Sequence, residues 1–376
     1  MIKDYMAIFD LSENENDIRS LTANRPIASI PFASRYRVID FMLSNMVNSG
    51  IRNVGIFSQA NSRSLVDHVG NGKPWDLNRK NDGLFLFSHG LSDLANHDSK
   101  LLKNNLEYIY RSKNDSVILS SSYMVCNLDI GDLVDNHEQS GCDITVAYVH
   151  TNDADKDFQN CYTLVIDKKE NRITGAGKNI GFTKSADICM ELFVLKKELF
   201  MDFLVKTAEN TNRGSVYNVI FDSIGKYSFN PYKVTGYVAC INSVKAYYKA
   251  SMDMLDSKKR NSLILAGNRP IYTKIKDEHP TLYVDGCSVK NSLVADGCII
   301  KGKVTNSLIS RYVTIEDDVE LDNCILLQNV TVRSGSRLSN VIIDKNAIID
   351  KDTELKGSPQ YPLVVEKRNI MNREVI

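Results

Sequence analysis

The sequence lacks the segments that would place a chain in a membrane or cross-link it by disulfides. No apolar run approaches the length of a membrane-spanning helix, and the start, Met1 to Tyr5, does not resemble a signal peptide. Eight cysteines occur without a Cys-x-x-Cys pair, and several lie inside apolar runs, as Cys298 and Cys324 do. We therefore expect reduced core cysteines in a cytoplasmic protein rather than disulfides or zinc ligands.

An excess of charge of either sign is also missing. Lys and Arg number 46, and Asp and Glu number 46. A neutral chain gives no general reason to expect a nucleic-acid or membrane partner. The 376 residues, 43% hydrophobic and 24% charged, have the composition of a globular protein long enough for two domains.

The first two thirds of the chain alternate strand-like and helix-like patterns. Residues 6–11 and 53–58 are short apolar runs, and residues 36–49 between them repeat apolar side chains at helical spacing. Further elements are expected at 101–111 (helix), 117–121 (strand), 132–139 (helix) and 143–149 (strand). This alternation predicts an α/β domain with a mixed, mostly parallel sheet covered by helices.

The sequence pattern changes near residue 282, where short runs of aliphatic residues alternate with polar residues and glycine. Aliphatic residues recur six apart, at Ile309, Ile315, Leu321 and Leu327, and again at Ile343, Ile349 and Leu355. A six-residue period places one inward aliphatic on each face of a triangular coil, which favours a parallel β-helix over an ordinary β-sandwich. The register slips between the two runs, which predicts one irregular turn. Residues 257–281, with few periodic apolar side chains, are the expected linker between domains 1–256 and 282–376.

Three blocks of sequence resemble a known family. They read Arg35-Tyr-Arg-Val-Ile-Asp-Phe-Met-Leu-Ser-Asn45 followed by Asn48-Ser-Gly-Ile51, then Pro74-Trp-Asp-Leu77 and Ala246-Tyr-Tyr-Lys249. Together with the order of the two domains, they resemble the bacterial ADP-glucose pyrophosphorylase (glucose-1-phosphate adenylyltransferase) family over nearly the whole chain. Within that family the chain looks most like the non-catalytic glycogen-biosynthesis partner of the catalytic subunit in Gram-positive bacteria. The resemblance implies a Rossmann-like nucleotidyltransferase domain followed by a left-handed β-helix.

The turn after the first expected strand departs from the family. It contains no glycine and carries three carboxylates, Glu13, Glu15 and Asp17. The family has a Gly-rich turn here, so that backbone N–H groups can approach the nucleotide phosphates. Aligned with the family pattern Gly-Gly-x-Gly-x-Arg-Leu, Asp17 takes the place of the arginine. Without the family, the segment would be a solvated acidic loop; within it, the turn argues against phosphate binding.

Both metal-binding aspartates of the family are missing as well. Ser122 stands where the family has an Asp that binds Mg²⁺, and Cys240 stands in the position of the second metal ligand. Mg²⁺ prefers carboxylate oxygen, so neither residue is a good substitute. Because the metal neutralises charge on the transferring phosphoryl group, losing both ligands removes the main electrostatic aid to catalysis. We expect no catalytic residues and no intrinsic cofactor, with Mg²⁺ only in the catalytic partner.

Other motifs bear on sugar and effector binding. The Glu-Lys-Pro motif of the family's sugar site is absent, and the corresponding residues 174–178 read Thr-Gly-Ala-Gly-Lys. Arg25 and Arg37 match family arginines near the allosteric anion site, with surface cations as the alternative. His68 and His137 are expected on helix surfaces rather than in a site.

The resemblance therefore implies a regulatory, catalytically deficient subunit of ADP-glucose pyrophosphorylase in glycogen biosynthesis. Its partner would be a catalytic subunit, in a homo- or heterotetramer, with an anionic effector such as a sugar phosphate. The alternative is an active glucose-1-phosphate adenylyltransferase with a rebuilt site, so the enzymatic status stays open. A hexapeptide-repeat acyltransferase is set aside, because such enzymes generally use a β-helix histidine and none of the 6 histidines follows residue 281.

Overall fold

The computed structural model describes residues 2–58, 63–88, 91, 106–209, 215–367 and 370–371 of the chain. These residues form two compact units whose segments alternate along the sequence. The first unit comprises Met1–Asn14, Phe41–Val238 and Ala266–Tyr272, and the second comprises Glu15–Asp40, Ala239–Leu265 and Thr273–Ile376. This division is not the one expected from the sequence, and helix α9 (Ser257–Ile264) forms inside the expected linker.

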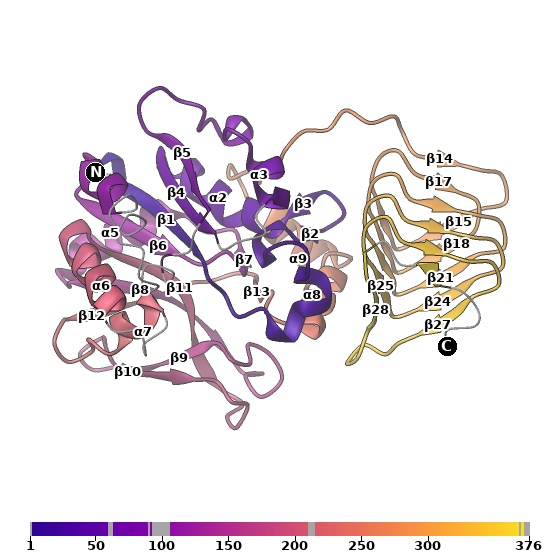
Figure 1. Ribbon diagram of the computed structural model, residues 1–376. Coiled ribbons are helices and arrows are strands. Elements are labelled where there is room, and N and C mark those ends of the chain that lie inside the picture. Colours follow the sequence, from indigo (N-terminus) through magenta and orange to yellow (C-terminus); the bar gives the residue numbers. More distant parts are fainter. Residues whose placement is uncertain are drawn as a thin grey trace. The chain divides into compact units, whose positions relative to one another are not determined.

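A mixed sheet forms the centre of the first unit (Figure 1). Its strands are β1 (Tyr5–Leu11), β4 (Asn53–Ser58), β5 (Gly83–Phe87), β6 (Ser116–Ser120), β8 (Ile144–Thr151), β9 (Tyr162–Asp167), β10 (Arg172–Lys178), β11 (Ala186–Lys196) and β12 (Phe229–Lys233). The strand order is β10-β9-β11-β6-β1-β4-β5, and β8 pairs with both β11 and β12. β1 lies parallel to β4 and β6, whereas β11 is antiparallel to β6. The α/β architecture with a mixed sheet covered by helices, predicted from the alternation, is confirmed.

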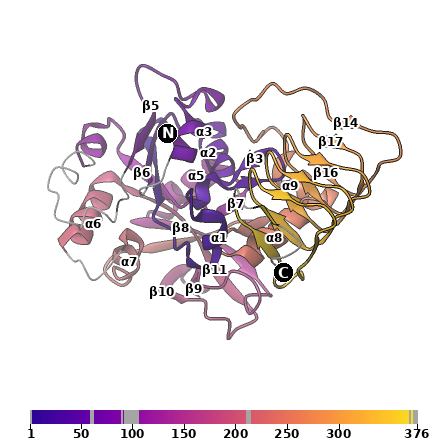
Figure 2. The same ribbon diagram turned by 45° about the vertical axis from the view of Figure 1, so that its right-hand side comes forward.

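Helices cover this sheet, and their apolar residues face it. They include α2 (Val38–Asn48), which spans the boundary between the units, and α3 (Arg63–Val69), α5 (Ile130–Ser140), α6 (Lys197–Glu209) and α7 (Val216–Phe221). In α5, Asp129 accepts a hydrogen bond from the Gly131 backbone N–H at 2.8 Å, and Gly141 closes the helix with a φ of 62°. Figure 2 shows α6 and α7 as neighbours, and their aromatic and aliphatic residues join the strands in one core. Residues 106–111 of the expected helix 101–111 are helical, and the rest lies outside the described residues.

Two histidines expected on helix surfaces are buried instead. His68 and His137 are each 6% exposed. The ring of His68 meets that of Trp75 edge-on, and Nδ1 of His137 lies 2.8 Å from the hydroxyl of Thr145. The prediction was wrong because it took account only of each helix and not of the neighbour that covers it. Among the residues described, no helix is both long and apolar enough to cross a membrane.

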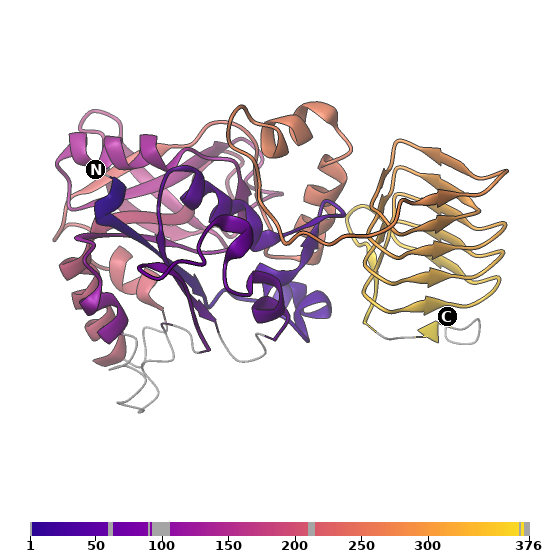
Figure 3. The same ribbon diagram turned by 90° about the horizontal axis from the view of Figure 1, so that it is seen from above.

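The β-helix lies in the second unit, where its coils stack as a ladder of short strands (Figure 3). The first face consists of β14 (Leu282–Tyr283), β17 (Ile299–Ile300), β20 (Thr314–Ile315), β23 (Thr331–Val332), β26 (Ile348–Ile349) and β29 (Ile370–Met371). The second consists of β15 (Ser288–Lys290), β18 (Lys303–Thr305), β21 (Glu320–Asp322), β24 (Arg337–Ser339) and β27 (Glu354–Lys356). The third consists of β16 (Leu293–Val294), β19 (Leu308–Ile309), β22 (Ile325–Leu326), β25 (Val341–Ile343) and β28 (Leu363–Val365). The parallel β-helix predicted from the six-residue period is confirmed.

The coil repeat explains the register slip in the sequence. Lys303 and Glu320, which are paired on successive coils, are 17 residues apart, one fewer than three six-residue steps require. The step from the second face to the third is the short one, so Leu326 rather than Leu327 belongs to the core cluster inside the helix. The slip therefore recurs at each such coil and is not one irregular turn.

Asparagines at one corner of the coil support the stack. Asn306, Asn323 and Asn340 have φ angles of 47°, 53° and 54°, a left-handed conformation that asparagine adopts more readily than most residues. Helix α8 (Val244–Asp253) packs at this corner, because the Tyr248 hydroxyl donates to the backbone oxygen of Asn323 at 2.7 Å. The second unit also contains α1 (Arg19–Thr22), β2 (Pro31–Phe32) and β3 (Tyr36–Arg37).

Candidate functional site

A glutamate closes the edge of the sheet at which an α/β protein ordinarily binds its ligand. That edge is the carboxyl end of the parallel strands, here β1 and β6. Glu13, just beyond β1, directs its carboxylate at the turn after β6. Its Oε1 accepts hydrogen bonds from the backbone N–H and the hydroxyl of Ser122, each at 2.7 Å. The other oxygen, Oε2, is closed off from solvent and has no hydrogen-bond partner among the described residues. This part of the acidic loop is therefore folded inward and is not solvated.

Glu13 belongs to a cluster of buried acidic groups. Asp10 on β1 is 0% exposed, while Glu191 on β11 and Tyr217 on α7 are each 6% exposed. Burial raises the pKa of Glu13 to about 8, with a smaller contribution from the charge of Asp10. Burial also raises the pKa of Glu191 to about 7 and lifts that of Tyr217 well above its usual range. The raised pKa values favour the protonated forms of Glu13 and, less strongly, Glu191 near neutral pH, and carboxyl groups that ionise there would repel phosphates.

Glu191 occupies a backbone position that disfavours its side chain. Its φ is 48°, in the left-handed region that glycine adopts more easily. The position lies where the pairing of β11 with β8 shifts register, between Cys189 and Phe193. The backbone N–H of Ser121 donates to the Glu191 carbonyl at 3.1 Å and so ties this bulge to the turn after β6. A strained residue that carries a buried carboxyl is typical of a site under functional constraint.

One lysine approaches this acidic cluster. Nζ of Lys178, at the end of β10, lies 3.3 Å from the centre of the Tyr162 ring. Burial lowers the pKa of Lys178, and the charge of Glu191 acts in the opposite direction. Lys178 closes the segment that replaces the Glu-Lys-Pro motif. One exposed cation beside buried acidic groups does not make a site for a nucleoside triphosphate.

The residues in the family's catalytic positions are a serine, an aspartate and a cysteine, Ser122, Asp17 and Cys240. Ser122 is buried in the first unit and uses its hydroxyl to hold Glu13. Asp17 and Cys240 belong to the second unit, Asp17 exposed and Cys240 buried at the end of β13 (Val238–Cys240). Throughout the described ranges, no group of three or more His, Cys, Asp or Glu side chains could hold a metal ion. A serine hydroxyl and a cysteine thiol are poor ligands for Mg²⁺, so Ser122 and Cys240 do not fit the metal of the family.

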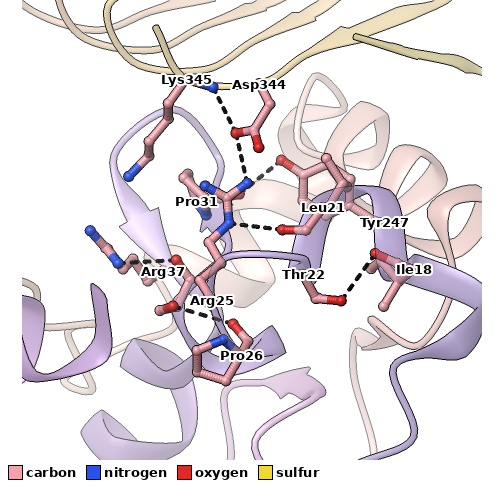
Figure 4. A network of polar contacts seen from close by, with 11 residues as sticks. Ile18, Leu21, Thr22, Arg25, Pro26, Pro31, Arg37, Tyr247, Asp344 and Lys345 are labelled. Carbon is pink, nitrogen blue, oxygen red and sulfur yellow. Dashed lines mark hydrogen bonds and ion pairs between the residues drawn. The ribbon is translucent and has the colours of Figure 1, made fainter. Parts of the chain in front are cut away.

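A buried ion pair accounts for Arg25, one of the two arginines expected to bind an effector (Figure 4). Its Nη2 lies 2.6 Å from Oδ1 of Asp344, and the side chains are 4% and 5% exposed. Its Nε also donates to the backbone oxygen of Leu21 at 2.9 Å. Arg25 thus joins the α1 segment to the β-helix within the second unit. Its guanidinium is already neutralised, which leaves it little capacity for a soluble anion.

Arg37, the other expected effector residue, lies in a group of cations. Figure 4 shows the ends of Arg37 and Lys345 on the same side of the Arg25–Asp344 pair. Burial, and then the charges of Arg37 and Arg25, lower the pKa of Lys345 to about 6. Burial and the charges of Arg311 and Arg37 also lower the pKa of Lys276. Such mutual repulsion would be relieved by an anion. The sequence did not point to Lys345, because only the tertiary fold brings it near Arg37.

Comparisons with known proteins agree with this architecture. A nucleotidyl transferase family model matches residues 17–159, and a GlmU-like, C-terminal hexapeptide model matches residues 283–359. The glycogen biosynthesis protein GlgD of Bacillus subtilis (strain 168) is 34% identical over 371 residues, which cover 96% of this chain and 95% of that protein. The GlgD of Geobacillus stearothermophilus is 35% identical over 377 residues, covering 99% and 98%. A glucose-1-phosphate adenylyltransferase of Mycoplasma mobile is 26% identical over 325 residues, or 84% of each chain.

The relationship extends over both parts of the fold. The two GlgD proteins align with almost the entire chain, so the similarity is not confined to the hexapeptide repeats or to the nucleotidyltransferase-like part. The resemblance inferred from residues 35–51 and the two shorter blocks is therefore confirmed. The chain belongs to the GlgD family, which is related to the glucose-1-phosphate adenylyltransferases.

Proposed function

We propose that this chain is a regulatory, catalytically deficient subunit of ADP-glucose pyrophosphorylase in bacterial glycogen biosynthesis. It would act in the cytoplasm on a catalytic subunit that makes ADP-glucose from ATP and glucose 1-phosphate, within a heterotetramer. The names of its GlgD relatives support the connection with glycogen.

The hydrogen bonds between Glu13 and Ser122 are the observation that carries the proposal. In a nucleotide-binding turn, backbone N–H groups are left free to meet phosphate. Here the Ser122 N–H, at the sheet edge where a ligand would bind, donates instead to the internal carboxyl group of Glu13 at 2.7 Å. The chain thus supplies its own acceptor at this position. Binding ATP would require displacing Glu13 and bringing phosphates toward Asp10 and Glu191, with no compensating metal.

The cations of the second unit support the regulatory part of the proposal. Arg37, Lys345 and Lys276 would hold an anionic effector, while Arg25 maintains the local structure through Asp344. Because the pKa of Lys345 is lowered to about 6, binding of an anion should be accompanied by proton uptake near neutral pH. An effector or partner changes activity only if it binds the states of the catalytic subunit unequally.

The test is steady-state ADP-glucose synthesis by the catalytic subunit, titrated with this chain, with complex formation followed by size-exclusion chromatography. We expect a complex whose apparent substrate affinity, turnover or effector response differs from that of the catalytic subunit alone. The Lys345→Met variant should still form the complex but lose part of the effector response, whereas Lys301→Met, elsewhere on the β-helix surface, should behave like the unmodified chain.

Three results would contradict the proposal. The two chains could fail to associate, or they could form a complex whose kinetics equal those of the catalytic subunit alone. ADP-glucose synthesis by the purified chain with Mg²⁺ would favour the alternative, an active adenylyltransferase with a diverged site.

A further inference from the structure

The second face of the β-helix carries an ordered pattern of charges, and we refer to it as the charged face. It is formed by β15, β18, β21, β24 and β27, which Figure 1 shows one above another. Residues of β18, β21, β24 and β27 line an open groove of about 530 Å³ on this face. The strand register aligns Lys303, Glu320, Arg337 and Glu354 in one column across successive coils. All four residues are exposed, and their charges alternate along the column.

Contacts within the chain leave this column incompletely paired. Glu320 lies 3.0 Å from Nζ of Lys303 and 3.8 Å from Nε of Arg337, so one carboxylate is shared by two cations. Glu354, at the end of the column, forms no ion pair with any residue in the described part of the chain. Exposed ion pairs of this kind contribute only about 0 to 1 kcal/mol each and exchange partners readily. The column can therefore form ion pairs with a second surface at little cost to its own fold.

We infer that the charged face binds the charged face of a second copy of this chain, with the two β-helices antiparallel. A two-fold axis parallel to the strands, midway between Glu320 and Arg337, reverses the order of the column. It places Lys303 opposite Glu354 of the other copy, and Glu320 opposite its Arg337. Both pairs form twice, as two-fold symmetry requires. A parallel arrangement would instead place each charge opposite itself, so the alternation selects the antiparallel one.

The size of the charged face sets the expected affinity of the dimer. Three steps of about 4.8 Å between neighbouring strands give the column a length of roughly 15 Å. A contact of this extent buries less than the roughly 800 Å² per partner that standard interfaces bury. The dimer should therefore be weak and sensitive to salt, since the charges are exposed and screening acts over about 10 Å at 0.1 M.

Sedimentation of the purified full-length chain over a range of concentrations and salt tests the inference. We expect a monomer–dimer equilibrium that shifts toward monomer as salt rises. Arg337→Glu should raise the dissociation constant by about tenfold, because it replaces two symmetry-related ion pairs with repulsions. Asp317→Lys removes the exposed Lys301–Asp317 pair, which is not among the groove-lining residues, and should leave the dimer unchanged.

The combined change Glu320→Arg and Arg337→Glu separates contacts between chains from contacts within one chain. It puts like charges next to each other along the column, yet opposite charges still meet across the two-fold axis. The inference therefore predicts that dimerisation recovers in this double variant relative to Arg337→Glu alone. A chain that stays monomeric at low salt would overturn the inference, as would a dimer indifferent to Arg337→Glu. If the double variant dimerises no better than the single one, the alternation serves only the stability of the β-helix.

Discussion

Replacing Glu13 with glutamine tests whether the loop after β1 closes the sheet edge through a protonated carboxyl group. In the folded protein, Oε1 of Glu13 accepts two hydrogen bonds from Ser122, and burial raises the pKa of the group to about 8. Glutamine keeps a carbonyl oxygen that can accept both bonds but cannot ionise. We therefore expect Glu13→Gln to match the stability of the natural chain below about pH 4.5 and to exceed it increasingly as the pH rises toward about 8.

The sign of this difference in stability follows from the linkage between proton binding and folding. The pKa is raised from 4.5 in the unfolded chain to about 8 in the folded one, so the folded state binds the proton more tightly. The stabilisation from this group is complete below pH 4.5 and is lost as the pH rises through about 8. At about 1.4 kcal/mol per pH unit between the two values, the loss approaches roughly 5 kcal/mol. Glu191, whose pKa is raised to about 7, contributes in the same direction and should account for a slope that remains in the variant.

Urea unfolding between acidic and alkaline pH, followed by tryptophan fluorescence, measures this effect. The sequence has 1 tryptophan, and Trp75 is buried in the same unit as Glu13. Glu198→Gln, at an exposed position on α6, is the matched control and should keep the pH dependence of the natural chain. If Glu13→Gln shows the same loss of stability with rising pH, then Glu13 is ionised in the folded protein and the argument for a closed sheet edge fails.

The remaining predictions concern single contacts. Ser122→Asp should destabilise the first unit by about 1 to 3 kcal/mol, because it removes the hydroxyl donor and places a second carboxyl beside the first; urea unfolding measures this. With Asp17→Arg and Cys240→Asp added, the triple variant should still show little ADP-glucose synthesis, and robust turnover would show that the acidic loop does not block the site. Arg25→Ala should cost about 3 to 5 kcal/mol in thermal or urea unfolding, because it leaves a buried carboxylate without its partner, whereas a loss below 1 kcal/mol would mean the pair is solvated. Gly302→Ala should lower the unfolding temperature of the β-helix in calorimetry, because the new Cβ would lie 2.5 Å from the Val319 backbone oxygen.

Much of the fold could be read from the sequence, because its signals are periodic and local. The alternation of apolar runs and helical stripes specified the α/β part, and the recurrence of Ile309, Ile315 and Leu321 specified a triangular coil. What the pattern missed was the length of the step from the second face of the coil to the third, since a coil that is one residue short is still filled by neighbouring aliphatic side chains. The burial of His137 was missed for a related reason: a helix pattern does not reveal which neighbour covers its ends.

The candidate site separates into what residue identity determined and what tertiary structure decided. The absence of glycine after β1, Ser122 in place of an aspartate and Cys240 in place of another were visible in the sequence, because each is a change of chemical type at an aligned position. The hydrogen bonds from Ser122 to Glu13 and the grouping of Lys345 with Arg37 were not visible. They join residues 109 and about 300 positions apart in the chain, and only packing can bring such residues together. The sequence by itself determined which phosphate- and metal-binding groups are missing, and the tertiary structure decided what fills their place, because burial makes the carboxyl of Glu13 hold a proton where an exposed one would not.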